Sequence, residues 1–187
     1  MPLLLFNPLS PLVGDDIDIE IVVTNGELGY YASEGFTDQP PKEQWITYTA
    51  ALADAAGYTP AAKQCTVKAT ESLPESRFEG LELDQSSSRE GGDIASEIAN
   101  KCDKGNLIRE DATAEQVEIY RASTAGLLET LLSADAYFKD KPDLVRCIVA
   151  RYTDLSDSEL IQHENGTRKE AGQDFAQWGR ECREENP

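Results

Sequence analysis

The sequence predicts an α+β protein in which an acidic, β-rich N-terminal part precedes a helical C-terminal part. Over residues 16–21, three acids alternate with three isoleucines, which is the period of a half-buried strand. Beyond about residue 90, apolar residues recur every three or four positions, as they do on one face of a helix. We therefore expect a β-rich region over residues 1–90 and a helical region over 91–187, either as two units or as one continuous domain.

The N-terminal part is expected to contain a hairpin and one helix. Asn25-Gly26 suits a type I′ turn, so we predict a β-hairpin over residues 16–33. Prolines followed by helically spaced apolar residues predict a helix over 41–56, ended by Gly57. The segment 60–72 has a helix-start signal but also alternates like a strand. We favour the strand, with further strands over 63–84.

Four to five helices are expected in the C-terminal part. The polar segment 85–92 suits a linker, and Asp93 suits the cap of the next helix, which would end near Gly105. Thr113 with Gln116 forms a capping-box pattern for a long helix over about 114–138. The remaining helix starts are marked by Pro142, by Ser156 with Glu159, and by Thr167 with Glu170.

The charge is strongly negative and unevenly distributed. Thirty-five Asp and Glu residues oppose seventeen Lys and Arg, giving a formal net charge of −18 at pH 7. Residues 1–41 contain seven acids and no Lys or Arg. Such a surface repels phosphate backbones and anionic lipids, so we expect neither direct nucleic-acid binding nor membrane binding. The expected partner is instead a basic protein.

The acids around the predicted hairpin are the candidate partner-binding residues. Alternate strand residues point to the same side, so the acids of one strand form a row, and one of two consecutive tyrosines should share their face. The candidates are Asp15, Asp16, Asp18, Glu20, Glu27, Tyr30, Tyr31 and Glu34.

The favoured function is that of a non-enzymatic interaction protein. It would dock on the basic, nucleic-acid-binding surface of a partner, as an inhibitor or adaptor of the kind that phages use against host defences. One alternative is a structural component of a virion or other assembly, in which the apolar arm 1–13 joins neighbouring copies. Another is an enzyme that holds a divalent metal through Asp16, Asp18 and Glu20. A high-salt habitat is a further explanation of the acidity.

No motif assigns a catalytic residue or a cofactor. Glycine-rich phosphate loops and the EF-hand spacing are absent from the sequence, and the single histidine, His163, is expected on the surface between two helix starts. The four cysteines show no CxxC spacing, which gives a zinc site little support. We expect reduced, mostly buried thiols in a cytoplasmic protein (in the host cytoplasm for a viral one). Two disulfides are the alternative for a secreted chain.

Overall fold

The computed structural model describes residues 18–25, 27–33, 35–81, 83, 89–102, 106–166 and 168–185. These residues form an antiparallel hairpin followed by seven α-helices, which confirms the predicted α+β class. The elements are β1 (Ile19–Thr24), β2 (Glu27–Ala32), α1 (Pro41–Ala55), α2 (Pro60–Ser72), the 3₁₀ turn η1 (Glu75–Arg77), α3 (Arg89–Cys102), α4 (Ala114–Ala134), α5 (Pro142–Thr153), α6 (Asp157–Asn165) and α7 (Arg168–Glu185).

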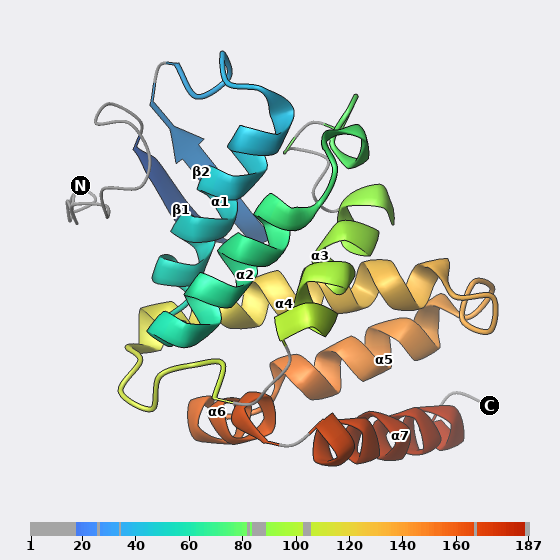
Figure 1. Cartoon of the computed structure of the whole chain (residues 1–187). Helices are drawn as coiled ribbons and strands as arrows, with labels where there is room; N and C mark the ends of the chain where they lie inside the picture. The colour runs from blue at the N-terminus through green and yellow to red at the C-terminus, as the bar shows by residue number, and fades with distance from the viewer. Residues whose placement is uncertain are drawn as a thin grey trace.

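Helix α4 is the central element of the fold (Figure 1). It contacts both strands as well as α1, α3, α5 and α6. The hairpin lies against α1 and α4 at one side of the molecule, whereas α5 and α7 pack together at the opposite side. One continuous hydrophobic core includes Ile19 of β1, Trp45 of α1, Ile94 of α3 and Leu160 of α6. The two regions distinguished in the sequence therefore share buried residues.

The predicted hairpin is confirmed over residues 19–32. Asn25 has a φ of 54°, the left-handed conformation that a tight two-residue turn requires. Ile21 pairs with Tyr30 and Glu20 pairs with Tyr31, so successive pairs face opposite sides of the ribbon. The predicted helix over 41–56 is also confirmed, since α1 begins at Pro41 and ends at Ala55.

The prediction of strands within 63–84 is wrong. Residues 60–72 form helix α2, in which Pro60 occupies the first turn and the Thr59 side chain accepts a hydrogen bond from the backbone N–H of Ala62. The buried residues of this helix are small or hydroxylated: Ala62, Thr66, Ala69 and Thr70. Turn η1 follows, and no strand occurs among the described residues of this segment.

The predicted count of four to five helices after residue 90 is confirmed by α3–α7. Both of the capping boxes that the described residues cover are formed, at Thr113 with Gln116 and at Ser156 with Glu159. Two boundaries differ. Helix α3 begins at Arg89, so Asp93 lies inside the helix, and α4 ends at Ala134 because Asp135 has an extended backbone. Thr167 lies outside the described residues.

The expectation of reduced thiols is wrong, because all four cysteines are paired. Cys65 of α2 is bonded to Cys102 of α3, and Cys147 of α5 is bonded to Cys182 of α7. The corresponding Cα atoms lie 5.6 Å and 5.8 Å apart, which suits a disulfide. Pairing follows from topology, since each bond joins two helices that pack against each other.

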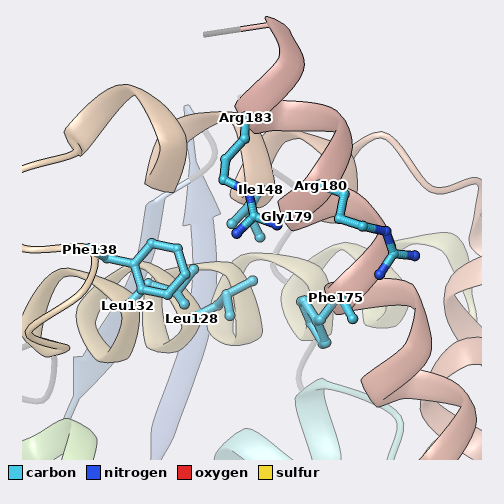
Figure 2. Close-up of a pocket in the computed structure, with 9 residues that line it drawn as sticks. Leu128, Leu132, Phe138, Ile148, Phe175, Gly179, Arg180 and Arg183 are labelled. Carbon is cyan, nitrogen blue, oxygen red and sulfur yellow. The ribbon is translucent and has the colours of Figure 1, made fainter. Parts of the chain in front are cut away.

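The second disulfide lies in a small separate core. Leu144, Ile148 and Cys182 are its buried members, and partly buried side chains of α4 and α7 pack around them. This core borders a groove between α4, α5 and α7, with a volume of about 450 Å³ (Figure 2).

Candidate functional site on the hairpin

The outer face of the hairpin carries the described candidate acids. Ile19, Ile21 and Tyr30 face inwards, and the two isoleucines are buried in the core. Because side chains alternate along a strand, Asp18, Glu20 and Glu27 lie on the opposite face, and all three are exposed. The alternation of isoleucine and acid in the sequence thus places the apolar side chains in the core and the carboxylates in solvent.

Of the two consecutive tyrosines, Tyr31 shares the face of the carboxylates. It pairs directly with Glu20 across the strands, and 68% of its surface is exposed. Tyr30 lies on the inner face, where its ring makes edge contacts with Phe36 and Tyr48. An exposed tyrosine flanked by acids combines an apolar ring with negative charge on one surface.

The hairpin carboxylates have no ion pair with any described lysine or arginine. Elsewhere in the described chain, several carboxylates are paired with cations. Lys101 and Arg77 flank Glu97 and lower the pKa of its carboxyl group, and Arg109 lowers the pKa of Asp111. The first 41 residues contain no cation, so the hairpin has no local partner of its own.

Three of the predicted binding residues, Asp15, Asp16 and Glu34, lie outside the described residues, as does the arm 1–13. The hypothesis of a metal-dependent enzyme assigned Asp16, Asp18 and Glu20 as the ligands of a divalent metal ion. Among the described residues, no third His, Cys, Asp or Glu ligand atom lies close enough to complete a group with Asp18 and Glu20. The structure therefore places Asp18, Glu20, Glu27 and Tyr31 on one face, with Tyr31 opposite Glu20 and with Glu27 at the turn end of the ribbon.

The surface position expected for His163 is wrong. Its side chain is only 6% exposed, because its ring stacks on Trp178 at a centroid distance of 5.6 Å and meets the edge of Phe175. Its Nδ1 atom lies 3.0 Å from a carboxylate oxygen of Glu164. Its Nε2 atom is shielded from solvent and lies 3.7 Å from Asp174, which is beyond hydrogen-bond distance.

Glu164 is the centre of a buried polar network that the sequence did not reveal. Its carboxylate accepts hydrogen bonds from the hydroxyl groups of Tyr120, at 2.5 Å, and Tyr152, at 3.1 Å. Burial, and secondly the charge of Glu164, raises the pKa of both phenols. The phenols therefore remain protonated donors. Since Nε2 of His163 is sealed from solvent, we assign the network to the interior of the fold.

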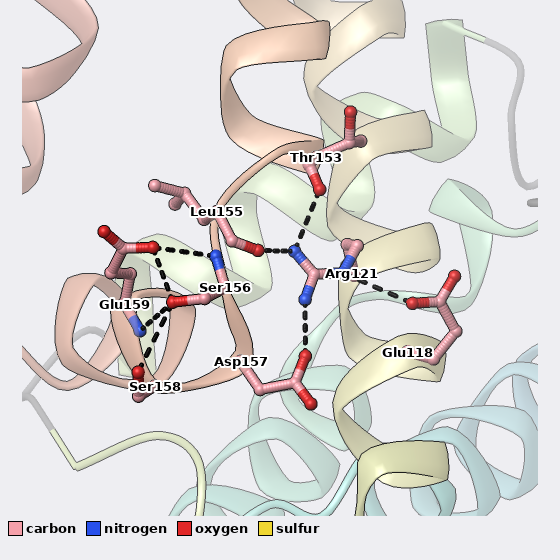
Figure 3. Close-up of polar contacts among 8 residues, drawn as sticks. All are labelled: Glu118, Arg121, Thr153, Leu155, Ser156, Asp157, Ser158 and Glu159. Atoms are coloured by element: carbon pink, nitrogen blue, oxygen red, sulfur yellow. Dashed lines mark hydrogen bonds and ion pairs between the residues drawn. The ribbon is translucent and has the colours of Figure 1, made fainter.

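A second polar cluster fixes the junction between α5 and α6 (Figure 3). The guanidinium of Arg121, on α4, donates to the carbonyl oxygens of Thr153 at 3.0 Å and Leu155 at 2.6 Å. It also donates to Asp157 at 2.7 Å. The Arg121 side chain is only 11% exposed, and it satisfies carbonyl groups left free where α5 ends. This cluster stabilises the helical part, and we assign it a structural role.

Comparisons with protein families, with curated proteins and with solved structures find no match to this chain. In the described part of the chain, no helix has the length and apolar character that crossing a bilayer requires. The candidate site therefore depends on the geometry and charge of the hairpin alone.

Proposed function

We propose that this chain is a non-enzymatic interaction protein whose hairpin docks on a cationic surface of a partner protein. The observation that supports this proposal is the exposed face formed by Asp18, Glu20, Glu27 and Tyr31, on which no carboxylate is paired with a described lysine or arginine. A partner that brings arginine or lysine to this face would form charge-assisted hydrogen bonds with these exposed carboxylates.

Charge and aromatic surface have different roles in this docking. The net charge of −18 attracts a basic partner over a long range and speeds association at low salt. Once the two proteins are in contact, Tyr31 offers a large apolar ring, and tyrosine and arginine are both frequent among residues that dominate binding energy. The face thus supplies long-range attraction and a short-range anchor.

Proteins that bind nucleic acids are the first class of partner we would test. Asp18 directly precedes β1 and Glu20 lies within it, so in an extended chain the two residues are about 6.8 Å apart. A groove that binds a nucleic-acid backbone presents a row of cations, because the backbone carries one negative charge per nucleotide. Such a row offers cations to both carboxylates. The docked chain would then act as an inhibitor or adaptor.

The test separates the hairpin face from net charge. A fluorescent arginine-rich peptide serves as the basic probe, and its dissociation constant is measured at two salt concentrations. The variant Glu20→Lys/Glu27→Lys reverses the charge of the hairpin face. The control variant Glu71→Lys/Glu129→Lys makes the same change in net charge on exposed positions of α2 and α4.

We expect the hairpin variant to weaken peptide binding at least about tenfold more than the control variant does. Both variants reduce the long-range attraction of the net charge, but only the hairpin variant also removes charge-assisted contacts with the peptide. For the wild type, binding should weaken as salt rises. Equal losses in the two variants would mean that the probe responds only to overall charge, and the assignment of the hairpin as the docking site would then be wrong.

The compartment is part of this proposal. Two disulfides favour an oxidising compartment, in which cystines persist, over the reducing cytoplasm predicted from the sequence. Mass spectrometry of the native protein after alkylation tests this directly. Full alkylation without prior reduction would place the protein in a reducing compartment, whereas absence of alkylation supports an oxidising one.

A further inference from the structure

The groove between α4, α5 and α7 combines an apolar wall with two arginines, although the protein as a whole is acidic (Figure 2). Its walls are formed by Leu128 and Leu132 of α4, by Phe138 of the following turn and by Phe175 of α7. These four side chains are only partly buried, so apolar surface remains accessible. A volume of about 450 Å³ lies within the range of small-molecule sites, roughly 300–1,000 Å³.

The two arginines, Arg180 and Arg183, lie one turn apart on α7 at the border of the groove. In Figure 2 the side chain of Arg183 extends from α7 towards the apolar side chains of α4, and Arg180 lies nearer to Phe175. Neither guanidinium forms an ion pair with a described carboxylate. Both are exposed, so they are available to an anion at the groove.

Tyr137 is contacted by two cations of this region. The Arg183 guanidinium donates to the Tyr137 hydroxyl at 3.2 Å, and the Lys141 ammonium lies 3.4 Å from the centre of its ring. These cations lower the pKa of the Tyr137 phenol, the hydrogen bond from Arg183 being the main cause. One hydrogen bond to Tyr137 leaves most of the five guanidinium donors of Arg183 for another acceptor.

The geometry points to a binding site for a small anionic amphiphile, an aliphatic carboxylate whose chain lies on the apolar wall and whose head group contacts Arg183 and Arg180. Charge complementarity selects this class of occupant. A neutral apolar ligand would gain no attraction from the guanidinium groups, and a cationic amphiphile would be repelled by them. The disulfide between Cys147 and Cys182 holds α5 against α7, which keeps the groove formed before the ligand arrives.

The experiment compares three ten-carbon probes by calorimetry on the whole protein: decanoate, decanol and decyltrimethylammonium, each below its aggregation concentration. The variant Arg180→Gln/Arg183→Gln removes the two charges. The variant Ala176→Glu places a carboxylate at an exposed lining position. The control Arg77→Gln/Arg146→Gln removes two surface arginines that do not line the groove.

The hairpin variant Glu20→Lys/Glu27→Lys should bind decanoate at least as well as wild type, which separates this site from the proposed docking face.

We expect decanoate to bind wild type and the control, and to bind at least about tenfold more weakly to both groove variants. Decanol should bind more weakly than decanoate, and the ammonium probe should not bind. Equal affinity for decanol and decanoate, or unchanged decanoate affinity in the groove variants, would overturn the proposal. A third result would also overturn the proposal: the wild type is a dimer that does not bind decanoate, and the variant Arg180→Gln/Arg183→Gln is a monomer. The occupant of the groove would then be a second copy of the chain.

Discussion

The hairpin and the helical part of this molecule use charge in opposite ways. On the hairpin face, three carboxylates point into solvent without a cation among the described residues. In the helical part, Arg121 joins three helices, and Glu164 accepts hydrogen bonds from two buried tyrosines. The same residue types thus hold the fold together in one region and are exposed to solvent in the other.

This contrast explains why net charge alone is a poor guide to the surface. A formal charge of −18 predicts an acidic exterior, and the hairpin fits that prediction. The groove beside α7 does not, because arginines there lie next to apolar side chains. What each surface can bind therefore depends on the cations and carboxylates that it exposes. If the contrast is correct, changes to the buried polar contacts of the helical part should affect stability, and changes on the hairpin face should affect binding alone.

The largest expected effect on stability comes from the disulfides. Replacing Cys65 and Cys102 by alanine should lower the free energy of unfolding by about 3–4 kcal/mol, because the bond closes a loop with a sequence separation of 37 residues. The pair Cys147 and Cys182, with a separation of 35, should give a similar loss. Urea unfolding with and without reductant measures this. Unchanged stability of wild type on reduction would contradict the pairing.

Arg121→Met should cost about 2 kcal/mol, because the methionine keeps most of the apolar stem but leaves the carbonyls of Thr153 and Leu155 without their donor. Arg146→Met is the matched control. Arg146 forms an exposed pair with Asp143 one turn away, so its loss should stay within about 0.5 kcal/mol. Similar urea midpoints for the two variants would remove the distinction between interior and surface charges.

The hairpin variant Glu20→Thr/Glu27→Thr should change the free energy of unfolding by no more than about 0.5 kcal/mol. Both side chains are exposed, and threonine is well suited to a strand. Thermal unfolding supplies the measurement, and the arginine-rich peptide should still bind more weakly than to wild type. A stability loss as large as that of Arg121→Met would show that these acids have a structural role after all.

The smallest effect concerns a single phenol. Arg183→Gln should raise the pKa of Tyr137 towards its ordinary value, since the main cause of the lowering is the hydrogen bond from Arg183. A pH titration of the ¹³C signal of the labelled tyrosine ring follows this change. Arg151→Gln, which removes a cation that pairs with Glu185 instead, should leave the titration of Tyr137 where it is in wild type.

Local signals in the sequence predicted the local structure well. The left-handed conformation of Asn25 and the two capping boxes each depend on residues within three positions of one another, so the sequence carries these signals directly. Helix α2 was missed because its buried face consists of alanine and threonine, which contribute little to an apolar period. The hydroxyl groups of Thr66 and Thr70 donate to carbonyl oxygens of their own helix, so these residues tolerate burial there.

Long-range contacts were not accessible from the sequence. Glu164 meets Tyr120 and Tyr152 only because α4, α5 and α6 pack together, and nothing in their spacing indicates this. The burial of His163 depends on Trp178 and Phe175 of α7 in the same way. For the candidate site, the sequence placed the acids of one strand in a row and one of Tyr30 and Tyr31 on their face. Which tyrosine this is, and that no described lysine or arginine pairs with the described acids, depended on the fold.

The two disulfides also determine how the chain would respond to a pulling force. Each closes a separate ring, one from Cys65 to Cys102 and the other from Cys147 to Cys182, and the rings do not overlap. Tension applied between the hairpin and the end of α7 could extend the hairpin, α1 and α4, yet the 37- and 35-residue separations inside the rings would contribute almost no length. Reduction of the two disulfides would allow these two segments to extend as well, one for each bond that is broken.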